Sequence, residues 1–285
     1  MTQTIAPETT IGEVQLTITN IDNALKFYRD QLGFSLLSQA GGQALLGAGS
    51  AGLLRLFENP AARKEKGVTG LYHFAVLLPD RRSFARLIYN LAENGIEVSG
   101  VADHGVSEAI YMSDPDGNGI ELYSDRRRND WPRDDLGRLQ MGTEQLDLED
   151  LLLELRNGLD PFSGLPEHTT VGHIHLHVAN LASADHFYRE VLGFELMQRY
   201  GTSAMFFSAG GYHHHVGVNV WAGEGAPPPP PDAIGLRWFE IRLPGQAALD
   251  AISARLQAAG IAFEAHDGGL LVRDPSQNGI LLTAG

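Results

Sequence analysis

The stretch FYRDQLGF at residues 27–34 recurs as FYREVLGF at residues 187–194, and DPDGNGIEL at residues 114–122 recurs as DPSQNGILL at residues 274–282. Both pairs have the same separation, which indicates that the chain contains a duplicated unit. The copies differ where a charged group could act, because Glu121 in one copy corresponds to Leu281 in the other. We therefore expect a shared scaffold with an unequal distribution of functional residues.

Composition restricts the class of protein. A chain of 285 residues is long enough for two domains, and its net charge of −14 argues against a general nucleic-acid binder. Since there is no cysteine, any metal must be held by histidines and carboxylates. The first residues do not indicate a signal peptide, and no run approaches the length of a membrane span. We expect a soluble cytoplasmic protein with neither nucleic acid nor membrane as a partner; a homo-oligomer is compatible with the sequence.

Each half of the chain divides into two modules, and each module has the element order β-α-β-β-β. In the first module, residues 14–18 alternate apolar and polar like a half-buried strand, and an apolar stripe at helical spacing follows until Gly33. The second module repeats this order, and we expect a helix over residues 80–94 and strands at 72–77, 97–98, 109–112 and 120–123. Modules three and four begin at Val171 and Gly235. The pattern predicts an α+β fold.

Two further segments separate these modules. Between the halves, leucines from Leu146 to Leu155 predict one amphipathic helix that starts near Thr143 and stops at Gly158. The five prolines at 227–231 predict a stiff loop between modules three and four. We therefore expect a first domain over residues 10–125, a connector with one helix over 126–169, and a second domain over 170–285.

The repeated motifs resemble those of the vicinal oxygen chelate superfamily, which includes glyoxalase I, extradiol ring-cleaving dioxygenases and bleomycin-resistance proteins. The stretches VGHIHL at 171–176 and GGYHHH at 210–215 are similar to a catechol 2,3-dioxygenase-like branch. The resemblance implies four βαβββ modules that form two curved, barrel-like mixed sheets. It also implies a divalent metal held by residues of the first and last strands of a module.

The resemblance points to His73 and His173 on first strands and to Glu121 on a last strand. Glu121 lies between Ile120 and Leu122, so its side chain points opposite to theirs, and a carboxylate turned into a cavity needs a partner such as a cation. Module four has Trp238 and Leu281 at the corresponding positions, so it supplies neither ligand.

The third ligand depends on which modules pair. If modules two and three share a cavity, His73, Glu121 and His173 form the two-histidine, one-carboxylate set typical of non-haem Fe(II) oxygenases; Mn(II), Ni(II) and Zn(II) suit the same donors. If modules one and two pair, the set is Glu13, His73 and Glu121, as in a glyoxalase-like isomerase or lyase. We favour the first pairing, because it gathers the ligand-rich modules and leaves modules one and four without metal.

The favoured hypothesis is an extradiol dioxygenase that cleaves a catechol-type aromatic with O₂. Of the histidines at 213–215, His215 shares a face with Asn219, which falls near the position of Glu121 in module two, so His215 or His175 is expected to take and return a substrate proton. Tyr123 and Tyr212 are expected to donate hydrogen bonds to oxyanions, and His104 is either a loop histidine or a substrate contact. A metal-free protein that sequesters a small molecule is the alternative from another class.

Overall fold

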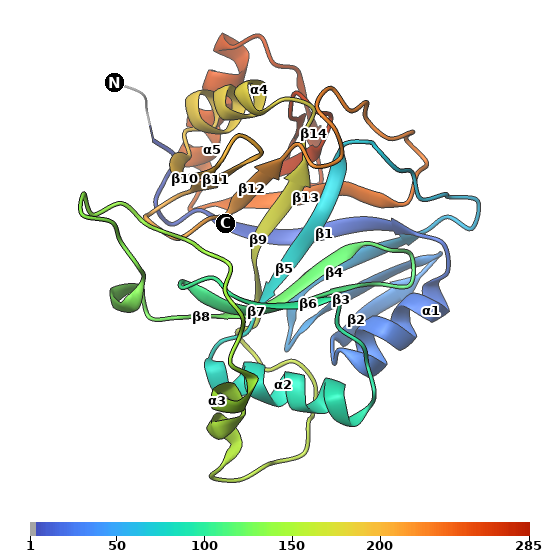
Figure 1. Cartoon of the computed structure of the whole chain (residues 1–285). Coiled ribbons are helices and arrows are strands. Elements are labelled where there is room, and N and C mark those ends of the chain that lie inside the picture. Colours follow the sequence, from blue (N-terminus) through green and yellow to red (C-terminus); the bar gives the residue numbers. More distant parts are fainter. Residues whose placement is uncertain (1–3) are drawn as a thin grey trace. The chain divides into compact units, whose positions relative to one another are not determined.

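The computed structural model describes residues 4–285, and its elements repeat one order four times (Figure 1). Each module consists of a strand, a helix and three further strands. Module one covers residues 10–58, module two 70–125, module three 170–219 and module four 235–284. The predicted α+β class and the four modules are thereby confirmed.

Modules one and two have the following bounds. Module one contains β1 (Thr10–Ile18), α1 (Ile21–Leu25), the π-helix η1 (Lys26–Gln31), β2 (Ser35–Ala40), β3 (Gln43–Ala48) and β4 (Ala51–Glu58). Module two contains β5 (Gly70–Leu77), α2 (Arg81–Glu93), β6 (Gly100–Asp103), β7 (Ser107–Ser113) and β8 (Gly119–Asp125).

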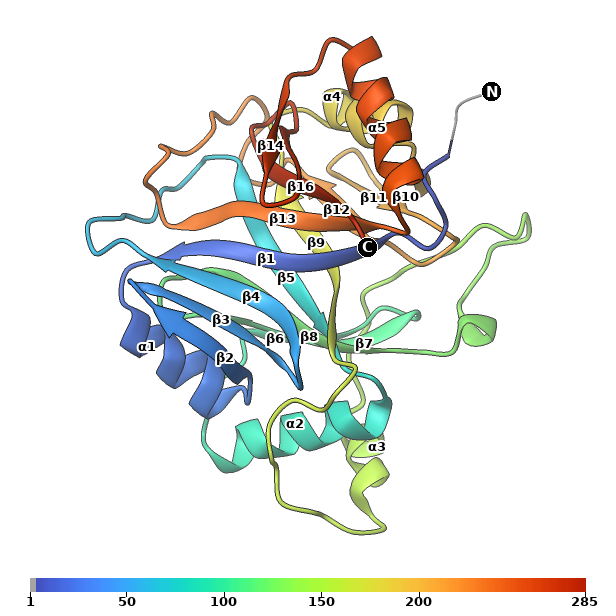
Figure 2. The same ribbon diagram turned by 180° about the vertical axis from the view of Figure 1, so that it is seen from behind.

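Modules three and four follow the same order. Module three contains β9 (Thr170–His177), α4 (Leu181–Asp185), the π-helix η4 (His186–Val191), β10 (Glu195–Tyr200), β11 (Ala204–Ser208) and β12 (Val216–Asn219). Module four contains β13 (Gly235–Leu243), α5 (Gln246–Ala258), β14 (Phe263–His266), β15 (Gly269–Arg273) and β16 (Gly279–Ala284). Figure 2 shows α5 beside α4, and contacts between α5 and η4 agree with that view.

The strands belong to two eight-stranded mixed sheets. One sheet holds β1–β4 and β13–β16, and the other holds β5–β12. Modules one and four therefore supply the strands of one sheet, and modules two and three supply those of the other. A cavity shared by modules two and three stays a prediction.

The chain folds into two compact units. Unit 1 comprises the N-terminal segment through Thr17, Arg63–Tyr72 and Gly172–Gly285; unit 2 comprises Ile18–Ala62 and His73–Val171. Within unit 1 the strands follow the orders β14-β15-β16-β13-β1 and β10-β11-β12-β9, and within unit 2 the orders β4-β3-β2 and β5-β8-β7-β6. The domain boundaries at 125 and 170 stay a prediction.

The first and last strands of a module are parallel neighbours. This holds for β5 and β8, for β9 and β12, and for β13 and β16. Because parallel strands in register place their side chains next to each other on one face, a first-strand residue meets a last-strand residue without any loop contribution. This pairing positions the candidate site.

The two motifs of the repeat bind each other. The Tyr28 hydroxyl donates to Asp114 Oδ2 at 2.9 Å, and the Tyr188 hydroxyl donates to Asp274 Oδ2 at 3.0 Å. Asn118 and Asn278 donate to the same two carboxylates from within each turn. The FY and DPxxNG motifs thus form a structural clasp, which occurs once in each unit.

Two predicted elements differ from the structure. The connector helix α3 covers only Leu148–Leu152 and continues as the 3₁₀ turn η3 (Leu153–Leu155), because the Asp147 side chain accepts a hydrogen bond from the Asp150 N–H and caps the helix there. Residues 97–98 are not in a strand, since backbone pairing with β7 begins only at Ser99, whose N–H donates to the Tyr111 carbonyl. Over residues 4–285, no helix is both long and apolar enough to cross a membrane.

Candidate active site

His73 and Glu121 form a buried pair on neighbouring strands of unit 2. His73 Nε2 lies 3.0 Å from Glu121 Oε2, and both side chains are almost inaccessible to solvent. The register places Glu121 beside Ala75, two residues after His73, so the pair is set by the parallel contact of β5 with β8. Ile120 and Leu122 are buried in the core on either side, as predicted for strand alternation. A buried carboxylate beside an imidazole nitrogen has the donor types that divalent transition metals take, so the pair fits a metal.

The surroundings of this pair are partly apolar. Tyr123, Ala75 and Ala109 form a fully buried cluster, with Leu77 and Tyr111 packed against it. The two alanines are small, so the larger tyrosine rings can pack closely against them. Tyr123, a site residue predicted from the sequence, lies on the same strand as Glu121, two residues further along.

Tyr111 is a candidate that the sequence patterns did not single out. It is the direct partner of Glu121 in the β7–β8 register, and its ring lies 5.6 Å from the ring of His73. The Tyr111 hydroxyl lies 2.6 Å from His104 Nε2, and His104 Nδ1 lies 2.7 Å from the Gly142 carbonyl. A carbonyl oxygen can only accept, so Nδ1 carries a proton and, in a neutral His104, Nε2 accepts from Tyr111. His104 thus lies in the loop between β6 and β7, which was one of the two predicted alternatives, and there it orients Tyr111.

In unit 1, His173 lies on β9 against the histidine run. Its ring centroid is 4.0 Å from that of His214 and 5.9 Å from that of His213, and His173 is buried. His213 and His214 share a hydrogen bond of 2.8 Å between their Nδ1 atoms, so one of them donates and the other accepts. His214 is therefore the member of the run that packs on His173.

His175 and His215 lie in different surroundings of unit 1. His175 is buried among the rings of Tyr72, Phe206 and Trp221, with centroids 5.1–5.6 Å away. His215 Nδ1 accepts a hydrogen bond from the Ala209 N–H at 3.1 Å and lies 3.0 Å from the Ser208 hydroxyl. A neutral His215 therefore carries its proton on Nε2. Tyr212 packs on both His213 and His215.

The position that corresponds to Glu121 in module three is Gly217. The register pairs His175 with Gly217 and His177 with Asn219, whereas it pairs Ala75 with Glu121 and Leu77 with Tyr123. The expectation that Asn219 lies near the Glu121 position is off by two residues, because the matching of turns by sequence alone did not fix the strand register. A glycine at position 217 avoids a close contact, since a Cβ there would lie 3.0 Å from the His175 ring.

Module four has no ligand pair at the corresponding positions. Trp238 and Leu281 are buried, and Leu281 lies beside Glu240 in the β13–β16 register. Glu240 has another role, since it accepts hydrogen bonds from the Glu13 N–H and from the Arg242 and Thr283 side chains.

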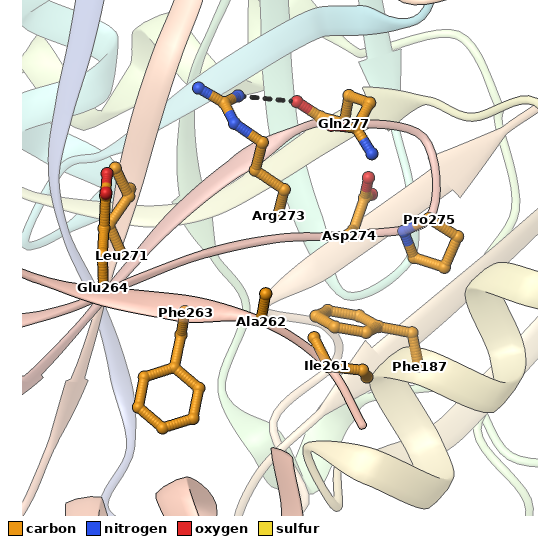
Figure 3. A pocket seen from close by; sticks show the side chains of 10 residues that line it. All are labelled: Phe187, Ile261, Ala262, Phe263, Glu264, Leu271, Arg273, Asp274, Pro275 and Gln277. Carbon is orange, nitrogen blue, oxygen red and sulfur yellow. Dashed lines mark hydrogen bonds between the residues drawn. The ribbon is translucent and has the colours of Figure 1, made fainter. Parts of the chain in front are cut away.

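A cavity of about 540 Å³ on module four is drawn in Figure 3, where Arg273 donates to the Gln277 carbonyl. None of the sequence-predicted site residues lines it.

Comparison with known proteins agrees with this architecture. The chain is 48% identical over 275 residues to the catechol-2,3-dioxygenase of Bacillus subtilis (strain 168), and the match covers 95% of each protein. Its fold is similar to that of glyoxalase I from Zea mays, with a TM-score of 0.60 and 16% identity over 97% of this chain and 92% of the maize chain. It is also similar in fold to the cppA protein from Streptococcus pneumoniae TIGR4, with a TM-score of 0.58 and 12% identity over 97% of this chain and 99% of that chain.

A family model adds the classification. Residues 10–122 and 170–281 both match the model of the Glyoxalase/Bleomycin resistance protein/Dioxygenase superfamily. These ranges contain both copies of the repeated motifs, apart from the final Leu282, and exclude the connector. The chain therefore belongs to the Glyoxalase/Bleomycin resistance protein/Dioxygenase superfamily.

Proposed function

We propose that the protein is an extradiol dioxygenase, a catechol 2,3-dioxygenase that opens a catechol-type ring with O₂. The observation that carries the proposal is the buried pair of His73 and Glu121, taken together with 48% identity to a catechol-2,3-dioxygenase. The bond between one hydroxyl-bearing carbon and its neighbour without a hydroxyl breaks. Both oxygen atoms of O₂ enter the product, in which the first carbon becomes a carboxylate and the second an aldehyde.

We propose that His173 joins His73 and Glu121 as the third ligand of one divalent metal. The three are buried residues with ligand-type side chains. Two histidines and one carboxylate leave coordination positions open and are the donor set of non-haem Fe(II) oxygenases, so Fe(II) is the favoured metal over Mn(II), Ni(II) and Zn(II). When bound, the metal supplies Lewis acidity toward the catechol oxygens and the redox chemistry of O₂.

The residues around the His73–Glu121 pair have distinct roles in this proposal. The Tyr111 hydroxyl donates its proton to His104, so it accepts a hydrogen bond from a substrate hydroxyl beside His73. Tyr123 forms the wall under the ring and excludes water from the pair, because it is fully buried with the two alanines.

Proton transfer is assigned to the histidines of unit 1. His175 lies two residues after His173 on the same face of β9, so it is placed to hold a substrate proton at a ring nitrogen. His215 is the second candidate, and its Nε2–H would donate a proton to a substrate oxygen, because Nδ1 already accepts a hydrogen bond from the Ala209 N–H. His214 belongs with these two candidates because its ring packs on His173.

The test combines turnover with metal content. Protein purified anaerobically and loaded with Fe(II) should convert catechol to a yellow ring-opened product, and no turnover over a panel of catechols would contradict the proposal. His73→Ala, Glu121→Ala and His173→Ala should each lose bound metal. Glu13→Ala is the matched control, since its metal content should stay unchanged; a loss there would instead favour the isomerase set of Glu13, His73 and Glu121.

A further inference from the structure

Unit 1 carries a cluster of aromatic rings around His175. The rings of Tyr72 and Trp221 meet edge to face at 5.1 Å, and each lies 5.1–5.5 Å from His175. His177 lies 5.1 Å from Tyr72. Such spacings are those of favourable aromatic pairs. The cluster therefore extends the face of β9 that carries His175.

Two members of this cluster are exposed although large aromatic rings gain stability by burial. Tyr72 is 40% exposed and Trp221 is 47% exposed, whereas His175 at the centre is buried. An aromatic surface of this kind, in contact with a buried polar group, is a common binding feature for an apolar ligand. None of these four side chains carries a fixed charge, so the surface suits a neutral ring better than a carboxylate.

Hydrogen bonds to Asn219 fix the backbone at Trp221 and the side chain of His177. The buried Asn219 side chain accepts from the Trp221 N–H at 3.0 Å, and its Oδ1 lies 2.7 Å from His177 Nδ1. Since the same oxygen contacts both residues, it fixes the start of the loop that carries Trp221. A rigid aromatic surface loses little conformational entropy when a ligand binds.

The proline-rich loop fixes the segment that carries Tyr72. The Thr69 N–H donates to the Pro227 carbonyl at 2.9 Å, and the Ile234 N–H donates to the Arg63 carbonyl at 3.0 Å. The prolines at 227–231 therefore lie between two anchor points on residues 63–69. Pro-rich segments are stiff, which gives this loop a role in holding Tyr72 near Trp221.

We infer that Tyr72 and Trp221 form an aromatic clamp that binds an aryl or other apolar substituent on the ring of the substrate. The inference rests on the proposed function, because it takes His175 as a neighbour of the substrate ring. A substituent that extends past His175 contacts both exposed rings. The protein then prefers catechols with an apolar substituent over unsubstituted catechol.

Kinetics with two substrates test the clamp. Trp221→Ala and Tyr72→Ala should each lower kcat/KM for 3-phenylcatechol by about tenfold, the loss expected for one aromatic contact, and leave kcat/KM for catechol within about twofold. Trp221→Phe should retain most of the preference because it keeps a ring. Tyr200→Ala is the control, since Tyr200 is an exposed tyrosine of the same unit that does not contact the cluster. Equal losses for both substrates, or an unchanged preference, would overturn the inference.

Calorimetry separates a failure of the clamp from a failure of the proposed function. Metal-free protein is titrated with 2-hydroxybiphenyl, a monophenol that carries the aryl group and requires no turnover. We expect binding to wild type and to Tyr200→Ala, and affinity about tenfold weaker for Trp221→Ala. If catechols are not cleaved but this difference is found, the proposed function fails and the clamp stands. If catechol is cleaved and the affinities are equal, the clamp alone is refuted.

Discussion

Small residues decide where the candidate site residues point. Ala75 and Ala109 pack against Tyr123, and Gly217 leaves room for the ring of His175. A Cβ at Gly217 would lie 3.0 Å from two carbons of the imidazole, closer than most real contacts. The His175 ring therefore lies close to β12 at Gly217, and a larger residue at that position would displace the ring.

Gly217→Ala should disturb His175 rather than the fold. The added methyl group must push the imidazole away, and a shift of the order of 1 Å at a group that handles protons can lower kcat by about 100-fold. Steady-state kinetics with catechol measure this change, and iron content should stay unchanged. Gly100→Ala is the control, because the nearest atoms to its Cβ are 3.8 Å away and its backbone is not in the left-handed region. Equal activity of Gly217→Ala and wild type would show that the position of His175 does not matter.

Tyr111→Phe tests the tyrosine that His104 orients. The variant keeps the ring beside His73 but removes the hydroxyl that bonds to His104. We expect kcat/KM for catechol to fall by about tenfold, because a substrate hydroxyl loses one hydrogen-bond acceptor worth about 1.4 kcal/mol, with iron content and stability close to wild type. Single-turnover kinetics and metal analysis measure the two effects separately. A large loss of iron would instead mean that Tyr111 supports the metal pair structurally.

The sequence patterns pointed to both members of the buried pair of His73 and Glu121, but not to the neighbours of that pair. His73 and Glu121 occupy positions in a repeated motif, and strand alternation correctly turned Glu121 away from Ile120 and Leu122. Tyr111 was not found, because its contact with Glu121 depends on the β7–β8 register. The bond of His104 to Gly142 depends on how the connector folds, and no local pattern contains that information.

At the scale of elements, the repeated motifs explain each other. The π-helices η1 and η4 bury Tyr28 and Tyr188, whose hydroxyls reach the carboxylates of Asp114 and Asp274. Burial is the main cause that raises the pKa of both carboxyls above the ordinary Asp value. A raised pKa means that each ionised carboxylate is costly and depends on its donors.

Tyr188→Phe and Tyr28→Phe should therefore destabilise the protein by similar amounts. Each variant leaves a buried carboxylate without one of its donors, which costs about 1–3 kcal/mol. Urea unfolding at pH 7 measures the loss for each repeat. Tyr200→Phe, which changes an exposed tyrosine, should have little effect. If the clasp variants unfold like wild type, the repeated tyrosines act only through the packing of their rings.

The helices were predictable where the apolar pattern is periodic. They were less predictable where one N-terminal capping residue sets the start of the helix. The helix over residues 80–94 agrees closely with α2, whose N-terminal Asp80 accepts from the Ser83 N–H. The leucine-rich connector has helical spacing over a longer stretch than α3, but Asp147 starts the helix late. Leucine spacing alone carried no information on that cap.

At the scale of the whole molecule, two kinds of contact join the repeated modules. The clasps join the helix of module one to the turn of module two and the helix of module three to the turn of module four. A second connection lies within unit 1, where β1 of module one is in the same sheet as β13 of module four. The first and last modules are thus held by pairing between β1 and β13, which are far apart in the sequence.

Glu240 is a charged contact of that pairing. It accepts from the Glu13 N–H of β1 at 3.0 Å, from Arg242 of its own strand at 2.6 Å, and from Thr283 of β16 at 2.6 Å. A Cβ on Gly12 would collide with its carboxylate, so the glycine makes space for the contact. Burial alone would raise the pKa of Glu240, but the hydrogen bonds from Thr283, the Glu13 N–H and Arg242 outweigh it and lower the pKa below the ordinary value.

A lowered folded-state pKa fixes the sign of the pH dependence. The unfolded chain binds the proton more tightly than the folded chain, so Glu240 contributes stability above the ordinary Glu pKa of 4.5, and that contribution is lost as the pH falls below it. Glu240→Gln should lower the free energy of unfolding by about 1–3 kcal/mol at pH 7, and by progressively less as the pH falls through the lowered folded-state pKa of Glu240. Urea titrations at several pH values measure this convergence, and Glu264→Gln, which changes an exposed carboxylate of the same unit, should follow wild type throughout. A constant difference at all pH values would show that Glu240 stabilises the β1–β13 pairing by shape and not by its charge.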